Sequence, residues 1–77
     1  MKWHDVSEAV DDPNVIAWAA KGQVRRYVVA NYVTAPRVGF LASVAWTTTI
    51  GETAECREFF PTREAAMAHC EAAERLN

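Results

Sequence analysis

The fold is decided by the stretch VGFLASVAWTT, residues 38–48, because its large apolar side chains recur at every second position. One alternating set contains Val38, Phe40, Ala42, Val44 and Trp46. Successive residues of a strand point to opposite faces of a sheet, so this spacing puts the whole set on one face. We therefore predict a central strand here, with this set facing the core.

Three more strands are predicted, two before this stretch and one after it. Residues 24–33, VRRYVVANYV, are rich in Val and Tyr, which strands favour. Residues 15–20 precede them across a Lys21-Gly22 turn, and residues 53–60 follow a turn at Gly51. A break around Pro36 separates the second and third strands. Consecutive strands joined by short turns predict an antiparallel meander.

The end of the chain predicts a helix over residues 62–76. Thr62 is a suitable N-cap, and Glu64 lies in the first turn, where the helix dipole favours an acid. Glu71 and Glu74 are expected to face water. Apolar residues recur every three or four positions and should pack on the sheet: Ala66, Met67, Cys70, Ala73 and Leu76.

The predicted fold class is α+β, an antiparallel four-stranded β-meander with one C-terminal α-helix packed on one face. We expect a single domain over 1–77, with an N-terminal segment at 1–14, the sheet at 15–60 and the helix at 62–76. The N-terminal segment is ambiguous, because residues 3–6 suit an edge strand and residues 7–10 suit one helical turn.

The first residues lack the 7–15-residue apolar run of a signal peptide, so none is expected. No stretch approaches the roughly 20 apolar residues of a membrane span, and we expect a protein of the bacterial cytoplasm without membrane contact. Two cysteines are too few for a disulfide framework. Cys56 and Cys70 are interpreted as two buried thiols, with a single bond between them as the alternative.

One helix cannot cover both faces of so aromatic a sheet. About fifteen helical residues span roughly 22 Å, enough for one face. Both faces carry large side chains, among them Trp18, Tyr32 and Leu41. Three alternatives follow: the sheet curls, the N-terminal segment covers the second face, or an apolar patch is left for a partner or for a second copy in a homodimer.

The charges are unevenly distributed, with a basic middle between acidic flanks. Residues 13–51 contain no acid but four cations, and the six glutamates that follow outnumber three arginines. We therefore consider two partner-binding surfaces. The first is a basic surface of Lys21, one of the adjacent residues Arg25 and Arg26, and Arg37, with Tyr27 or Tyr32 nearby. The second is an acidic helix surface of Glu64, Glu71 and Glu74.

No motif specifies catalysis, a metal or a cofactor. His69 and Cys70 are adjacent, and adjacent helix residues point about 100° apart, so they cannot act as a couple. Metal-ligand spacings and glycine-rich phosphate loops are absent from the sequence. We predict a protein that is not an enzyme and uses no cofactor.

Two resemblances bear on function. Residues 38–48, the turn at Gly51 and FFPTREAAMAHCEAAERL (59–76) resemble the strand–strand–helix half of a double-stranded-RNA-binding domain. That family starts this helix with lysines, whereas here only Arg63 stands beside Glu64, and the family's long N-terminal helix is missing. The whole chain is short, Cys-poor and mildly acidic, with a β-meander and a final helix that opens with Phe60, Thr62, Glu64 and Ala65. In these respects it resembles small phage or prophage accessory proteins of the anti-CRISPR-like kind.

The second resemblance implies a non-enzymatic protein-binding inhibitor or accessory factor of bacterial mobile elements. Such a protein would occupy a surface of a host protein or nucleoprotein complex. The alternative is a small nucleic-acid-binding module that uses the basic region of the sheet.

Overall fold

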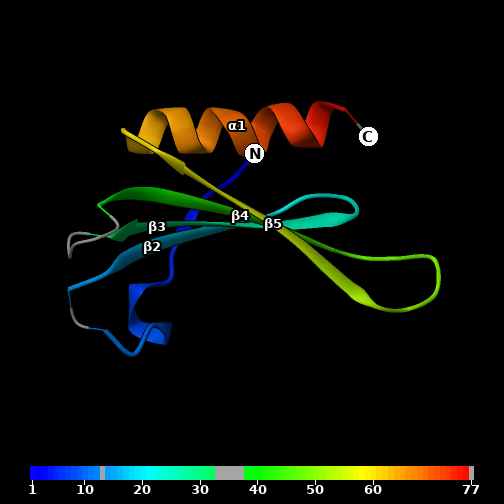
Figure 1. The fold of residues 1–77 in the computed structure, drawn as a ribbon, viewed down its shortest axis with the longest axis horizontal. Helices are drawn as coiled ribbons and strands as arrows, with labels where there is room; N and C mark the ends of the chain where they lie inside the picture. The colour runs from blue at the N-terminus through cyan, green and yellow to red at the C-terminus, as the bar shows by residue number, and fades with distance from the viewer. Residues whose placement is uncertain (13, 33–37, 77) are drawn as a thin grey trace.

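The computed structural model describes residues 1–12, 14–32 and 38–76. It contains one antiparallel sheet in the order β1-β2-β3-β4-β5 and one helix, α1, laid across one face (Figure 1). The α+β class, the antiparallel sheet and the C-terminal helix are confirmed. The bounds are β1 His4–Asp5, β2 Ile16–Lys21, β3 Arg25–Tyr32, β4 Gly39–Thr47, β5 Thr53–Phe60 and α1 Arg63–Arg75.

The predicted number of four strands is wrong, because β1 adds a fifth at the edge beside β2. Both alternatives for the N-terminal segment occur together: β1 is followed by a short 3₁₀ helix, η1, at Ser7–Ala9. The Asp5 carboxylate accepts hydrogen bonds from the Ser7 amide at 2.9 Å and from the Ser7 hydroxyl at 2.6 Å. This local turn ends the strand after two residues.

The four predicted strands form: β5 has the predicted bounds, and the described ends of the other three differ from the predicted ones by one residue at most. β2 starts at Ile16 and extends to Lys21, and β3 and β4 each start one residue later than expected. The break expected around Pro36, like the end of the strand at Val33, lies outside the described residues. Gly51 has a φ of 84°, a left-handed conformation that glycine adopts without steric cost, which explains its place in the β4–β5 turn.

The hydrophobic core lies between α1 and the sheet. Alternation along β4 is confirmed, with Ala42 and Val44 buried and Phe40 and Trp46 packed beside them. The expectation that Val38 faces the core is wrong, because it precedes β4 and is 68% exposed. The helix contributes its predicted stripe, with one exception. Leu76 is 86% exposed, because α1 ends at Arg75. The buried cluster contains Ala20, Tyr27, Val29, Ala42, Val44, Ala66 and Cys70.

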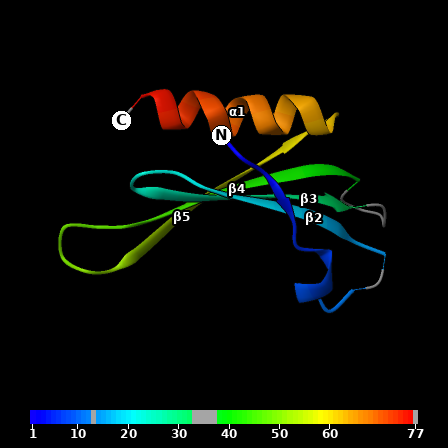
Figure 2. The same ribbon diagram turned by 180° about the vertical axis from the view of Figure 1, so that it is seen from behind.

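The second face of the sheet is covered only in part. α1 lies on one side of the sheet and η1 on the other, as two opposite views show (Figures 1 and 2). Near η1, Ala17 is only 1% exposed, whereas Val28 and Tyr32 are 37% and 38% exposed. Two of the three alternatives therefore hold together: the N-terminal segment covers the β2 side, and a patch remains open. Among the described residues, no helix is long and apolar enough to cross a membrane.

Candidate functional site: the uncovered face of the sheet

The candidate site is the face of β2–β5 that points away from α1, here called the uncovered face, although the N-terminal segment buries it at Ala17. The strand register arranges its side chains in three rows that run across the sheet. The first row is Ala17, Ala30, Leu41 and Phe59. The second is Ala19, Val28, Ser43 and Arg57. The third is Lys21, Arg26, Ala45 and Glu55. Small residues occupy many of these positions, and the larger side chains lie mainly on β5 and at the Lys21–Arg26 pair.

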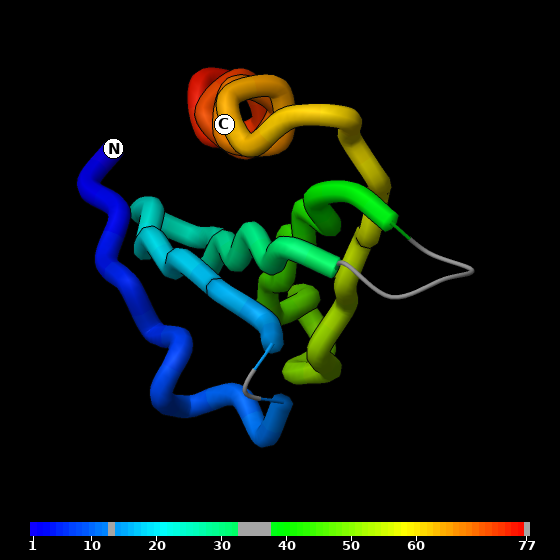
Figure 3. The backbone as a smooth tube through the Cα atoms, turned by 90° about the vertical axis from the view of Figure 1, so that its left-hand side faces the viewer, coloured from blue at the N-terminus to red at the C-terminus, as the bar shows by residue number. Residues whose placement is uncertain are grey.

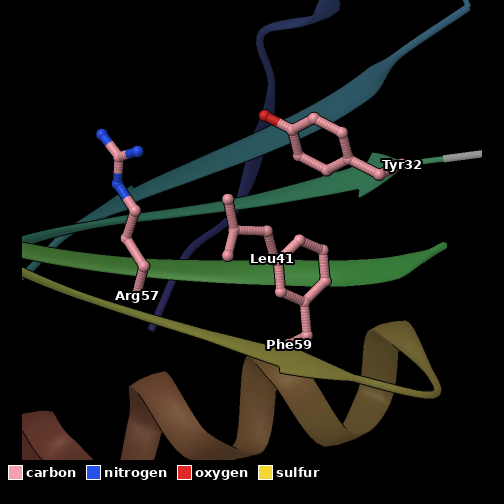
Figure 4. Close-up of a pocket in the computed structure, with 4 residues that line it drawn as sticks. All are labelled: Tyr32, Leu41, Arg57 and Phe59. Atoms are coloured by element: carbon pink, nitrogen blue, oxygen red, sulfur yellow. The ribbon is translucent and has the colours of Figure 1, made fainter. Parts of the chain in front are cut away.

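An aromatic hollow lies at one end of the uncovered face. Tyr32, Leu41, Arg57 and Phe59 line a depression of about 350 Å³ and rise from the sheet on the side opposite α1 (Figure 4). The rings of Tyr32 and Phe59 meet edge to face, with centroids 5.9 Å apart. The hollow thus combines aromatic and aliphatic surface with one guanidinium group.

Arg57 is held in place by Glu55, two residues earlier on the same strand. Arg57 Nε donates to one carboxylate oxygen of Glu55 at 2.8 Å, and Arg57 Nη2 donates to the other at 3.2 Å. This pairing lowers the pKa of Glu55 and raises that of Arg57. Arg57 therefore presents to the hollow an exposed guanidinium that is already paired with a carboxylate.

A second depression lies at the β1 side of the uncovered face. It has a volume of about 450 Å³ and is bordered by His4 and Val6 of the N-terminal segment and by Val28 of β3. Lys21 and Arg26 also line it and stand directly opposite each other across the β2–β3 pair. Within the described chain neither cation forms an ion pair with an acid. This end of the face is therefore cationic and apolar.

The structure separates the residues of the predicted basic surface. Arg26 lies on the uncovered face, whereas Arg25 lies on the α1 side with its guanidinium 5.7 Å from the Trp46 ring centroid. Tyr32 is exposed, but Tyr27 is fully buried, so the expectation that Tyr27 meets a partner is wrong. Tyr27 and Val29 are two residues apart on β3, so both side chains point to the same face of the sheet, which is the core side. Arg37 lies outside the described residues.

The predicted acidic surface is also divided. Glu64 is 76% exposed at the start of α1, and its Oε1 lies 3.6 Å from Nη2 of Arg63. Glu71 is half-buried in the middle of the helix. Glu74 is half-buried and faces water only in part, because its carboxylate accepts hydrogen bonds from the Tyr27 hydroxyl at 2.7 Å and from the Gln23 amide at 3.1 Å. These bonds lower the pKa of Glu74. Glu74 thus fastens the helix to the sheet.

The two thiols occupy different environments and are both free. Cys70 is fully buried beneath α1, and burial raises the pKa of its thiol to about 11, so it is protonated and unreactive at neutral pH. Cys56 is exposed on β5, which corrects the expectation that both are buried. Among the described residues, no group of three or more His, Cys, Asp or Glu side chains could hold a metal ion.

Sequence reasoning missed Leu41, Arg57 and Phe59 as candidate site residues. The signal was present, because Glu55, Arg57 and Phe59 alternate along one strand and so share a face. What the sequence lacks is the register that brings Phe59 opposite Leu41 and near Tyr32. Only the pairing of β4 with β5 completes the hollow.

The chain was also compared with known proteins. No family model, curated protein or solved structure matches it. Function must therefore be inferred from the uncovered face and from the charges around it.

Proposed function

We propose that the protein is a non-enzymatic binding protein that attaches to an acidic surface of a protein partner through its uncovered face. The observation that carries this proposal is the cation pair Lys21 and Arg26 beside the exposed Val28. An apolar centre flanked by arginine and aromatic side chains is the composition that dominates protein-binding energy.

The two cations impose a cost on the isolated chain. Like charges directly opposite each other in a strand pair destabilise it, and Lys21 and Arg26 occupy such positions. An acidic partner would convert this repulsion into two attractive contacts. Because both side chains are exposed, their main effect would be to speed association and to select a partner of opposite charge.

Three features favour a protein over a nucleic acid. Arg57 is already paired with Glu55, whose carboxylate competes with a phosphate for the same guanidinium. Tyr32 and Phe59 contact each other edge to face, whereas stacked bases require open ring faces. The whole chain carries a net charge of −2. The second candidate, a module for single-stranded nucleic acid, is favoured only by the proximity of cations and aromatic rings on one face.

A surface of this kind suits a protein that acts by occupying part of its target. An inhibitor or accessory factor of the anti-CRISPR-like kind, directed at a host nucleoprotein complex, needs a rigid face and no catalytic group. The two depressions on the uncovered face would serve as contact points for such a target. This part of the proposal rests on the resemblance of the whole chain to small phage proteins.

The proposal is tested with two substitutions of similar chemistry on opposite faces. Val28→Glu places a charge in the uncovered face, and Ile16→Glu places one on the α1 side at a position with a comparable exposure of 45%. Each tagged variant and the wild type would be used to capture proteins from bacterial lysates, with quantification by mass spectrometry. We expect wild type and Ile16→Glu to retain the same protein and Val28→Glu to lose it.

Equal capture by all three proteins would contradict the proposal, as would a lack of any specific protein. A fluorescent single-stranded oligonucleotide tests the second candidate. Binding that weakens steeply as salt rises, and that Lys21→Glu with Arg26→Glu abolishes, would favour the nucleic-acid module instead.

A further inference from the structure

The two edges of the sheet differ in their availability to another strand. β1 contains two residues, and the N-terminal segment continues the bonding beyond it, since the Ala17 amide donates to Ser7 Oγ at 3.0 Å. β5 contains eight residues, pairs with β4 on one side, and has no strand on its other side among the described residues. Figure 3 shows the N-terminal segment and β5 at opposite sides of the sheet. A long open edge is a template for strand addition.

The charge pattern of β5 selects one partner and one register. Two copies can pair antiparallel about a two-fold axis perpendicular to the sheet, which keeps equivalent faces on the same side and centres the pairing on one residue. A centre at Glu55, Arg57 or Glu58 brings that residue opposite its own copy and creates a like-charge pair. A centre at residue 54 pairs only residues 53–55 of the two copies, and a centre at residue 59 pairs only residues 58–60.

A centre at Cys56 avoids every like-charge pair. Glu55 of each copy then stands opposite Arg57 of the other, and residues 53–59 pair. The existing contact of Arg57 Nε with Glu55 at 2.8 Å would become part of an alternating square of two carboxylates and two guanidinium groups. Such cross-strand pairs of opposite charge stabilise a sheet.

We propose that β5 is the docking edge for a second copy of this chain, paired antiparallel about a two-fold axis at Cys56. The result is one continuous sheet with both α1 helices on one side. The two uncovered faces then form a single larger face on the other side. One strand per copy buries little area, so the dimer is weak and forms at high protein concentration.

The position of Cys56 provides a direct reporter of this register. Residues directly opposite in antiparallel strands have Cα atoms about 4.5–5.5 Å apart, within the roughly 4.4–6.8 Å that a disulfide spans. Added glutathione disulfide would oxidise the two facing Cys56 thiols to one disulfide bond between the copies. The glutathione disulfide would be reduced to two glutathione thiols in the same exchange. Cys70 is buried and does not take part.

The first experiment measures association and cross-linking of the full chain. We expect sedimentation to show a monomer–dimer equilibrium at protein concentrations up to about 1 mM, the weak end of specific binding. Glutathione disulfide should convert wild type and Cys70→Ser to a covalent dimer and should leave Cys56→Ser without one. A chain that stays monomeric throughout this range would overturn the proposal.

The second experiment tests the register by exchanging charges. Arg57→Glu places Glu opposite Glu twice and should weaken the dimer about tenfold or more, whereas Glu55→Arg combined with Arg57→Glu should restore it. Cys56→Lys brings two cations together at the axis and should also prevent association. A dimer that is indifferent to these changes would contradict pairing through β5.

This inference goes beyond the proposed function and can fail separately from it. Cys56 faces the α1 side, as its partner Val44 does, so Cys56→Lys leaves the uncovered face unchanged. Loss of dimerisation with retained partner capture would separate the two surfaces.

Discussion

Tyr27 shows how a single hydroxyl connects the middle of the sheet to the end of the helix. The ring is fully buried, and its hydroxyl donates to the Glu74 carboxylate, which also accepts from the Gln23 amide. Gly22 makes this arrangement feasible, because a Cβ atom at position 22 would collide with the Glu74 carboxylate. The β2–β3 turn and the last turns of α1 are thereby fastened together.

This contact predicts a loss of stability at alkaline pH. Burial and the Glu74 carboxylate raise the pKa of Tyr27 from 10.0 to about 12 in the folded protein. The folded state holds the phenolic proton more tightly than the unfolded state. The resulting stabilisation is therefore complete below pH 10 and is lost as pH rises from 10 towards 12.

Urea denaturation across that pH range measures the effect. In Tyr27→Phe the free energy of unfolding should be lower at neutral pH and should fall less steeply above pH 10. Tyr32→Phe serves as the control and should keep the steep fall. The same alkaline dependence in Tyr27→Phe and wild type would show that another group is responsible.

Part of this residue-scale picture could be predicted from the sequence. Positions 27 and 32 differ in parity along one strand, so alternation alone separates the two tyrosines. The inward turn of Glu74 could not be predicted. Helical periodicity gives the direction of a Cα–Cβ bond, whereas the carboxylate turns inward because Gly22, far away in the sequence, leaves room for it.

At the level of elements, α1 is fixed by its first turn as well as by its buried stripe. The Thr62 hydroxyl accepts a hydrogen bond from the Ala65 amide at 3.1 Å, as expected of an N-cap. The Arg63 guanidinium lies 5.1 Å from the Trp18 ring centroid and connects the same turn to β2. The helix start is therefore fixed by both local and tertiary contacts.

Removal of the cap should destabilise the whole chain, since a domain of this size has one small core. Thr62→Ala is expected to lower the free energy of unfolding by about 1 kcal/mol, because the Ala65 amide loses its partner. Thr62→Ser keeps the hydroxyl and should remain close to wild type in urea denaturation. Equal stability of all three would mean that the cap contributes nothing measurable.

The elements that sequence predicts well are those with a long repeating pattern. β4, β3 and α1 each contain enough positions for alternation or helical spacing to be visible. β1 contains only His4 and Asp5, too few residues to show any period, and its pairing depends on where β2 lies. The exposure of Cys56 could have been predicted, because a meander of consecutive strands puts residues 53–60 last, at an edge of the sheet.

At the scale of the whole molecule, we propose separate roles for two surfaces. The uncovered face offers cations, apolar surface and two depressions on one side of the sheet, and the β5 edge offers a self-complementary charge pattern. A two-fold axis at Cys56 would place two uncovered faces side by side. A partner with repeated acidic surfaces would then be bound by both copies with increased avidity.

The most direct test of the central claim is site-specific photo-cross-linking in bacterial lysates. A photoreactive residue would be placed at position 28 on the uncovered face, at position 16 on the α1 side of the sheet, or at position 64 on the helix. We expect a protein partner to be cross-linked from position 28 and not from the other two. Cross-linking from position 64 or 16 alone would contradict the account, because the partner would then contact the helix side of the molecule.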